Sequence, residues 1–505
     1  MGPGRSKLAR IRRISQIAWL ALFILLLAIP HPSRLFLEVD PLTALAGALA
    51  SGALYRGLLW SLVVIVPTLF LGRAFCGWVC PLGTLNHFFS WFKSERKRGK
   101  GLIESNRYRK WQSLKYYVLI AALAAALAGS AIGGLLDPIS LLVRSMAVGV
   151  LPVLNYASRG ALALKQMHFR QGALSGAILF GILLLNLRVT RFWCRVLCPL
   201  GGLLGWLSRG SILNLRKNPA ACDQCNRCLA GCQGGDDPIP GALWRKAECH
   251  LCFNCVAECP TAGIAFEFMA RPSGAVSGPD IERRKLLAGI GAGLAIVPVL
   301  RASAGLAVEN DARLIRPPGS LDERDFLSRC IRCGACMQVC PNNALHPAAS
   351  EAGIEGLWTP VVAPRIGYCE PSCLLCGQAC PTGAIWEFTA REKGWAAGSV
   401  AASQPIRIGT AFYDRGRCLP WAMATECIVC EEWCPVSPKA IYLEDAQVVD
   451  SAGSLKTLKQ PRVDPRRCVG CGACEYACPL QEHPAVYVTS IGESRSPSSQ
   501  VLLTR

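Results

Sequence analysis

Cysteine spacing constrains the fold of this chain more than any other feature of its sequence. The 505 residues include 28 cysteines, and 24 of these fall into six groups of four. Three groups, beginning at Cys249, Cys330 and Cys468, have the full spacing C-x2-C-x2-C-x3-C-P. The six quartets are Cys222, Cys225, Cys228 and Cys232; Cys249, Cys252, Cys255 and Cys259; Cys330, Cys333, Cys336 and Cys340; Cys369, Cys373, Cys376 and Cys380; Cys418, Cys427, Cys430 and Cys434; and Cys468, Cys471, Cys474 and Cys478.

This spacing brings three thiolates around one iron–sulfur cube and leaves the fourth iron for a more distant cysteine. We therefore expect six 4Fe-4S clusters with all 24 cysteines as iron ligands. Three quartets vary the pattern: Gln233 replaces the proline, one extra residue precedes Cys373, and a longer loop precedes Cys427. Zinc fits less well because it prefers two separated ligand pairs closing one tetrahedral site. Disulfides fit less well still, because neighbours three residues apart bridge poorly.

Adjacent quartets are expected to exchange their fourth ligands, so that two clusters share one module. In the first module, the triplet beginning at Cys222 would take Cys259, and the triplet beginning at Cys249 would take Cys232. Two arrangements stay open for the last four quartets. Neighbours can pair, or the first can pair with the fourth and the second with the third, which resembles four-cluster subunits of molybdenum oxidoreductases.

Four apolar stretches in the first 190 residues are long enough to cross a bilayer, at about 14–30, 53–72, 116–136 and 172–188. Lys and Arg gather before the first stretch and after the second and fourth, which predicts a cytoplasmic N-terminus. Residues 1–301 hold 35 Lys and Arg against 13 Asp and Glu, a net +22, whereas residues 302–505 hold 19 against 21, a net −2. This distribution favours cytoplasmic loops beside anionic lipid and argues against nucleic-acid binding.

The predicted fold class is mixed membrane α + α/β, a polytopic helical membrane domain followed by ferredoxin-like 4Fe-4S domains. Four segments are expected. They are a four-helix transmembrane domain at 1–210, a two-cluster ferredoxin domain at 211–270, a linker at 271–305 and a four-cluster ferredoxin domain at 306–505.

The linker contains Arg283 and Arg284, an apolar run to Leu300 and an Ala-x-Ala ending at Ala304. These are the parts of a twin-arginine export signal, and they also fit a short fifth transmembrane helix. Either reading carries the C-terminal domain across the membrane, because an even number of spans precedes it. The predicted location is the bacterial cytoplasmic membrane, as a multi-pass protein with a periplasmic C-terminal domain.

The four remaining cysteines, here called the boundary cysteines, form two C-x3-C-P-L-G motifs: Cys76 and Cys80, and Cys194 and Cys198. Each motif follows an even-numbered span, so both should lie at the cytoplasmic boundary. Two thiol pairs meeting there could hold a seventh metal centre, or cycle between dithiol and disulfide. They could also be small buried residues at turns. His87 is close to the first motif and could serve quinone chemistry, but a lone histidine is more often structural.

These motifs match a known family. Residues 1 to about 270 resemble NapH, a membrane ferredoxin of periplasmic nitrate reductase systems, in their four spans, two C-x3-C-P motifs and two-cluster segment. Residues 281–505 resemble NapG and its relative MauM, exported four-cluster ferredoxins with a twin-arginine signal. The chain thus looks like a fusion of the two.

The resemblance implies electron transfer from the membrane quinol pool toward a periplasmic oxidoreductase or cytochrome partner, with quinol as substrate. Quinol dehydrogenase activity would then be its catalytic activity, although no catalytic residue can be named. The alternative is a maturation factor that supplies electrons for cofactor installation in a periplasmic enzyme, as proposed for MauM and MauN. The chain contains no dinucleotide glycine fingerprint and no P-loop.

Overall fold

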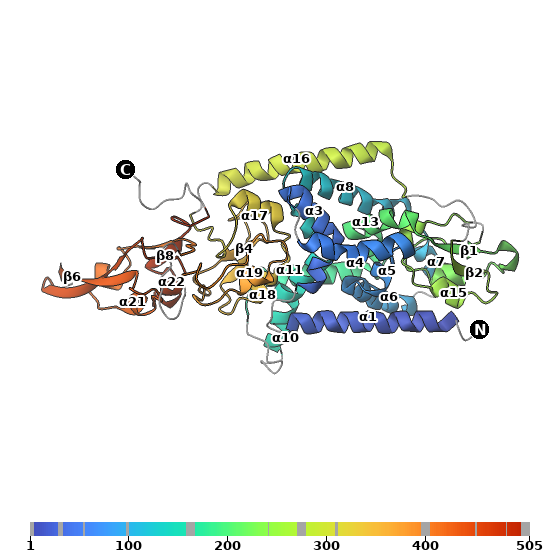
Figure 1. The fold of residues 1–505 in the computed structure, drawn as a ribbon. Coiled ribbons are helices and arrows are strands. Elements are labelled where there is room, and N and C mark those ends of the chain that lie inside the picture. The colour runs from blue at the N-terminus through green and yellow to red at the C-terminus, as the bar shows by residue number, and fades with distance from the viewer. Residues whose placement is uncertain are drawn as a thin grey trace. The chain divides into compact units, whose positions relative to one another are not determined.

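The computed structural model describes residues 5–28, 34–53, 56–96, 100–157, 167–240, 242–269, 279–308, 312–394, 405–449, 452–480 and 482–495. The chain divides into two compact units, drawn in Figure 1. Unit 1 comprises Met1–Val150 and Ala173–Pro298, and unit 2 comprises Leu151–Gly172 and Val299–Arg505. The two-cluster segment at 211–270 therefore belongs to the same unit as the N-terminal helices.

The helical part of unit 1 contains two similar runs of helices. In each run an Asp-Pro pair begins one apolar helix: Asp40 caps α3 by accepting from the Leu42 amide at 2.9 Å, and Asp137 caps α9 by accepting from the Ser140 amide at 2.8 Å. A second apolar helix, a short helix containing the first cysteine of the C-x3-C motif and a helix beginning at Pro-Leu-Gly follow. The first run is α1 (Arg5–Ala28), α2 (Leu35–Glu38), α3 (Pro41–Ser51), α4 (Arg56–Leu71), α5 (Ala74–Trp78) and α6 (Pro81–Arg96); after α7 (Lys100–Asn106) and the 3-10 turn η1 (Lys110–Ser113) the second is α8 (Leu114–Leu127), η2 (Ile132–Leu135), α9 (Pro138–Arg144), the π-helical turn η3 (Ser145–Val150), α11 (Gly172–Leu185), α12 (Phe192–Val196) and α13 (Pro199–Leu207).

Among the described residues, three helices are long and apolar enough to cross a membrane: Lys7–Ala28, Pro138–Ala157 and Arg283–Ala302. Pro41–Ser51, Gly57–Leu71 and Gly172–Leu185 are apolar but shorter. The stretch expected at 116–136 is a helix only to Leu127, because Gly129 then takes a φ of 83° and the chain turns. The Pro138–Ala157 helix, with Arg144 buried inside it, was not predicted as a span.

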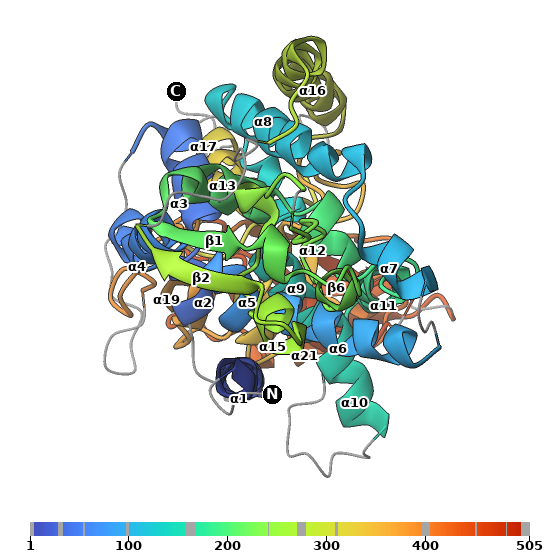
Figure 2. The ribbon, with the colours of Figure 1, turned by 90° about the vertical axis from the view of Figure 1, so that its right-hand side faces the viewer.

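Helix α16 (Arg283–Val308) contains the paired arginines and runs beside α8 in both views (Figures 1 and 2). Two glycines one turn apart make the contact. A side chain at Gly293 would collide with the Ala121 carbonyl and with the Ala124 methyl group, and one at Gly289 would touch the backbone of Tyr117. Small residues spaced in this way let two helices approach closely within a membrane. From Arg283 onward the predicted linker is therefore a long helix, of a length that suits a fifth span.

The two-cluster segment of unit 1 is built on two antiparallel strands that enclose both quartets. Strand β1 (Leu213–Lys217) precedes the first quartet and β2 (Ile264–Phe268) follows the second, with Leu215 opposite Phe266. Leu215, Trp244 and Ile264 form a buried core with Cys228 and Cys255. The turn η4 (Ser208–Gly210) comes just before β1. Between the strands lie η5 (Pro219–Ala221), α14 (Arg227–Ala230), η6 (Lys246–Glu248) and α15 (Asn254–Glu258) in chain order.

Unit 2 consists of short elements joined by cluster-binding loops. They are α10 (Leu151–Ala157), α17 (Glu323–Arg329), α18 (Ala335–Gln338), β3 (Leu345–Pro347), β4 (Pro360–Val362), α19 (Leu375–Ala379), β5 (Thr410–Tyr413), α20 (Leu419–Ala422), α21 (Val429–Glu432), β6 (Ile441–Val449), β7 (Leu455–Val463), α22 (Ala473–Ala477) and β8 (Val486–Thr489). The longest described strands, β6 and β7, have nine residues each and pair with one another.

One part of the predicted fold class needs correction. Every described sheet has two strands and is antiparallel, pairing β1 with β2, β3 with β4, β5 with β8 and β6 with β7. The ferredoxin-like modules are therefore α+β and not α/β. The reason is that the strands flank the cluster loops and pair back on each other, so no crossover helix is needed to join parallel strands.

Two residues just before α11, His168 and Phe169, pack on the C-terminal domain within unit 2. The His168 carbonyl accepts a hydrogen bond from Asn343 Nδ2 at 2.8 Å, and the Phe169 ring meets His346 edge to face at 5.5 Å. The part of the chain from Leu151 to Gly172, which lies between the third and fourth predicted spans, thus belongs to the same compact unit as residues 299–505.

Candidate iron–sulfur centres

The four quartets with C-x2-C-x2-C-x3-C spacing, with or without the final proline, share an unusual backbone conformation. In each, the residues directly before and directly after the second cysteine have positive φ: Gln224 and Asn226, Leu251 and Phe253, Arg332 and Gly334, and Gly470 and Gly472. Left-handed residues in such loops turn successive backbone N–H groups inward and create concave sites for anions, including iron–sulfur clusters. Leu251 and Phe253 adopt this conformation despite their side chains, which is a strained arrangement for residues other than glycine. The loops therefore fit the predicted clusters.

In the first module the structure brings together the cysteines that the spacing assigned to each cluster. The thiol of Cys228 lies within electrostatic range of Cys222, Cys225 and Cys259. The thiols of Cys249 and Cys255 lie within range of Cys252 and Cys232. The exchange of fourth cysteines follows from the pairing of β1 with β2, which brings the two loops together.

In unit 2 neighbouring quartets pair. Cys336 lies within range of Cys330, Cys333 and Cys380, while Cys369 and Cys376 lie within range of Cys340 and Cys373. Likewise Cys418 and Cys430 approach Cys427 and Cys478, and Cys474 approaches Cys468, Cys471 and Cys434. Strand β5 before one pair and β8 after it repeat the arrangement of β1 and β2, as does the bridge between Ser320 and Ile385 around the other pair.

The space between these thiols suits a cluster. A cavity in unit 2 is lined by Cys340, Cys369, Cys373 and Cys376 together with Lys393. Backbone amides also point at sulfur atoms, with Ala344 N donating to Cys340 Sγ at 3.3 Å and Ile385 N to Cys380 Sγ at 3.4 Å. Hydrogen bonds of this kind tune the reduction potentials of iron–sulfur clusters.

The two modules of unit 2 meet at Cys369 and Cys471. The Cys369 amide donates a hydrogen bond to the Cys471 carbonyl at 2.8 Å, and the two thiols lie within electrostatic range. The four ligand sets therefore form a series in space that differs from their order in the chain. The set containing Cys330 is first, followed by those containing Cys369 and Cys468, and the set containing Cys418 is last.

Burial controls the protonation of these thiols. It raises the pKa of Cys228 to about 11 and the pKa of Cys418 and Cys471 to about 12. Without iron these groups are neutral at pH 7, so binding a cluster must displace a proton from each thiol.

The boundary cysteines, which are far apart in the sequence, come together in the structure. All four are buried, and the thiol of Cys198 lies within electrostatic range of the other three. Cys80 and Cys198 each stand at the start of a helix and accept a hydrogen bond through sulfur, from the Gly83 amide at 3.4 Å and the Gly201 amide at 3.2 Å. Each C-P-L-G motif is thus a helix cap in which cysteine replaces the usual serine or aspartate.

The glycine of each motif has no room for a side chain. A Cβ atom at Gly83 would lie 2.8 Å from the Cys76 carbonyl, and one at Gly201 would lie 2.8 Å from Arg73 Nη2. Proline at the first helical position costs nothing, since its missing N–H would have no helical partner there. The cysteine and the glycine of each C-P-L-G motif therefore shape the thiol site, and the proline suits the start of the helix.

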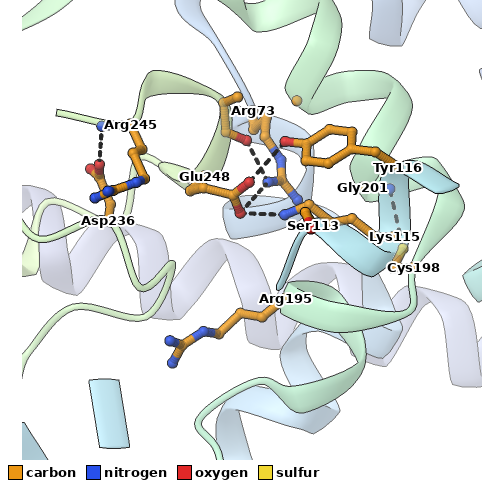
Figure 3. Close-up of polar contacts among 12 residues, drawn as sticks. Arg73, Ser113, Lys115, Tyr116, Arg195, Cys198, Gly201, Asp236, Arg245 and Glu248 are labelled. Carbon is orange, nitrogen blue, oxygen red and sulfur yellow. Dashed lines mark hydrogen bonds and ion pairs between the residues drawn. The ribbon is translucent and has the colours of Figure 1, made fainter. Parts of the chain in front are cut away.

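A buried network of charges lies beside these thiols (Figure 3). The Glu248 carboxylate forms an ion pair with Lys115 and accepts from the Tyr116 hydroxyl at 2.8 Å, while Arg73 Nη1 lies 3.9 Å from it. Arg73 Nη1 also donates to the Ala247 carbonyl at 2.7 Å. Because Glu248 precedes Cys249, this network ties the first ferredoxin module to the helices.

Gln233, which replaces the proline of the first quartet, makes a second connection between the first ferredoxin module and the helices. Its Oε1 accepts from Arg12 Nη1 of α1 at 3.3 Å, and its Nε2 lies 2.8 Å from His87 Nε2 of α6. Burial, with the nearby positive charges of Arg191 and Arg12, lowers the pKa of His87 to about 2. His87 is therefore a neutral partner of Gln233, which supports the structural reading of this residue.

Sequence reasoning missed Arg73 and Arg191. Both are fully buried, and each stands three residues before the first cysteine of its motif. The repeated R-x2-C-x3-C-P-L-G would have revealed them. Arg191 Nη1 donates to the carbonyl of Cys76 in the other motif at 3.0 Å.

Comparison with known proteins places these motifs in named families. A family model described as a 4Fe-4S binding domain matches residues 53–101 and 171–218, which contain the boundary cysteines. A second 4Fe-4S binding domain matches residues 326–346, and a 4Fe-4S dicluster domain matches residues 423–481. No solved structure matches the chain significantly.

Among curated proteins, the methylamine utilization ferredoxin-type protein MauM of Paracoccus denitrificans is 35% identical over 35% of this chain and 72% of its own length. The ferredoxin-type protein NapG of Escherichia coli K12 is 32% identical over 42% of this chain and 86% of its own length, and NapG of Haemophilus influenzae is 36% identical over 40% and 69%. These matches confirm the predicted iron–sulfur, electron-transfer character of the chain. It belongs to the family of the MauM and NapG ferredoxin-type proteins.

Proposed function

We propose that the chain is a membrane-bound relay that takes electrons from the quinol pool and passes them through six 4Fe-4S clusters to a periplasmic oxidoreductase or cytochrome. The observation that carries this proposal is the serial arrangement of ligand sets, in particular the Cys369–Cys471 contact that joins two modules into one path. The 24 quartet cysteines are the iron ligands of these clusters. Iron–sulfur clusters suit such a path because their potentials can be graded over roughly −700 to +450 mV.

The ligand geometry favours clusters over single ions. Within the described residues, which include all 28 cysteines, no group of three or more His, Cys, Asp or Glu side chains is placed to hold one metal ion. A cubane cluster separates its thiolates, because each one binds a different iron.

Several features support a multi-pass membrane location with a periplasmic C-terminal domain. Helices α1, α4, α11 and α16 expose large apolar side chains such as Ile17, Leu59, Phe180 and Leu287. The segment between α10 and α11, which the charge pattern places outside, packs on the C-terminal domain through Phe169. The close approach of α16 to α8 favours a fifth span over a cleaved signal.

A maturation role remains the second candidate, because MauM, named for methylamine utilization, is among the relatives of highest identity. In this reading the same clusters would reduce a periplasmic enzyme during cofactor installation. Both functions use every ligand, so they differ only in the electron acceptor.

The test is reduction of anaerobically purified, full-length protein by a quinol analogue, followed by EPR. The relay predicts quinol-dependent cluster reduction and reoxidation by a periplasmic reductase or cytochrome. Substituting Cys471→Ser should leave reduction of clusters upstream intact while slowing reoxidation. Clusters that quinol cannot reduce would refute direct quinol oxidation and favour the maturation role.

A further inference from the structure

We propose that the four boundary cysteines bind a seventh iron–sulfur cluster and that Arg73 and Arg191 balance its negative charge. The site takes iron and sulfide, each thiol releases its proton on binding iron, and the cluster then gains or loses one electron. Its role as a link in the relay rests on the proposed function, but its existence does not.

The first argument is symmetry. The two runs of helices place one R-x2-C-x3-C-P-L-G motif each around a common point. Arg73 lies within electrostatic range of Cys76, Cys194 and Cys198, and Arg191 within range of Cys80 and Cys194, so each arginine faces cysteines from both motifs. Two pairs of thiols related in this way supply four ligands to one group on the symmetry axis. A dithiol–disulfide pair would need only two.

The second argument is that the surroundings of two of the sulfur atoms favour a negative charge on them. Cys80 and Cys198 cap α6 and α13, where helix N-terminal N–H groups and the helix dipole favour a negative charge. Their N–H···S bonds from Gly83 and Gly201 resemble those made to Cys340 and Cys380 in unit 2. The same local chemistry thus recurs at the boundary cysteines and at the quartets.

The third argument is unbalanced positive charge. Arg73, Lys115 and Arg191 are fully buried around these thiols, and Glu248 is the acidic partner found among them, which leaves an excess of two positive charges (3 − 1 = 2). Nε and Nη2 of both arginines have no hydrogen-bond partner among the described residues. Buried unpaired cations are costly, whereas a cluster with four thiolate ligands is an anion that would satisfy them.

The site also has a direct connection to the first ferredoxin module. A side chain at Gly77, next to Cys76, would collide with the carbonyl of His250, next to Cys249. Trp78 Nε1 donates to the Leu251 carbonyl at 2.9 Å. Backbone contact therefore joins the boundary site to the ligand set of Cys249, as the Cys369–Cys471 contact joins the modules of unit 2.

The test compares wild-type protein with a Cys80→Ser/Cys198→Ser variant, both full length and purified anaerobically. Serine keeps the helix caps, so the fold should survive. Wild type should hold iron and sulfide beyond the requirement of six quartet clusters, and the variant should lose that excess together with one Mössbauer component. The quartet signals should remain. Equal iron, sulfide and spectra in the two proteins, with four boundary thiols that alkylate only after reduction, would overturn the proposal in favour of a disulfide pair.

Arg191→Gln and Arg191→Lys test the charge role. Loss of the positive charge should disfavour the reduced cluster, so the Gln variant should lower the midpoint potential of one EPR component, while the Lys variant keeps it near wild type. A purely structural arginine would give the same result for both variants. These readouts do not require quinol, so a chain that carries the seventh cluster yet fails to accept electrons from quinol would refute the proposed function alone.

Discussion

The quartets and the boundary cysteines assemble thiols in opposite ways. A quartet draws three ligands from one loop of about ten residues, whose left-handed backbone at positions such as Leu251 and Phe253 already forms a concave site. The boundary site draws two cysteines from each of two helix pairs, more than a hundred residues apart, and depends on buried charges from α8 and the first module. Local geometry therefore builds the first kind of site, and tertiary packing builds the second. Four substitutions test this difference, and the largest effect is expected first.

Removing a quartet ligand should cost more than removing a boundary ligand. Cys255→Ser deletes a cluster around which the small core of Leu215, Trp244 and Ile264 is built. Because cluster binding and folding of so small a module are coupled, we expect loss of iron together with loss of the module's cooperative melting by circular dichroism. Cys80→Ser should lose only boundary iron and melt like wild type. Similar melting of the two variants would contradict the comparison.

Breaking the buried Glu248 network should be the next largest effect. Glu248→Gln leaves Lys115 and Arg73 without their carboxylate partner, which costs about 3–5 kcal/mol when a buried pair loses one member. The matched control is Glu267→Gln, which breaks an exposed pair with Arg216 at 3.0 Å, worth about 0–1 kcal/mol. Thermal unfolding in detergent measures both. Equal losses would show that the boundary site does not depend on buried charge.

The contrast between locally built quartets and a boundary site built by packing would weaken if a quartet also depended on distant charges. The ion pairs of Glu323 in unit 2 test this dependence. Burial raises the pKa of the Glu323 carboxyl, but Arg316 at 2.6 Å and Arg495 at 2.8 Å overcome that effect and lower it to about 2. The stabilisation is complete above the unfolded pKa of about 4.5 and is lost as pH falls through the folded pKa of about 2, about 3 kcal/mol in all. Melting temperature should fall with pH in wild type and less steeply in Glu323→Gln. Parallel pH profiles would disprove the ion-pair assignment.

The smallest effect is expected at Gly201. Gly201→Ala forces Arg73 Nη2 away from a contact of 2.8 Å and crowds Cys198 Sγ at 3.4 Å, an overpacking cost of about 1–3 kcal/mol. Gly210→Ala, where nothing lies within 4 Å, is the control. Iron content should fall in the first variant and stay unchanged in the second. A full complement of iron in Gly201→Ala would show that the motif glycine does not shape the site.

The quartets could be predicted because their ligands are neighbours in the sequence. Their pairing in unit 2 could not, since it depends on β5 meeting β8 and on the bridge from Ser320 to Ile385, both of which join residues far apart in the chain. The predicted boundaries of the membrane spans were also inaccurate, because composition does not reveal that α8 ends at Leu127 and not at 136. The boundary site could be predicted only in part. Its cysteines repeat visibly, but Lys115 and Glu248 carry no local signal of their role.

The bonds that Gln233 makes to Arg12 and His87 have a kinetic consequence. Together with the Trp78–Leu251 and Arg73–Ala247 bonds, they hold the first ferredoxin module in place on the helices of unit 1. A soluble ferredoxin must diffuse to its partner, so its turnover depends on concentration and on the ionic strength that governs encounter. In the proposed relay, electron exchange between the boundary site and the first module would be a first-order step within one molecule. Its rate should therefore be the same in dilute and concentrated protein.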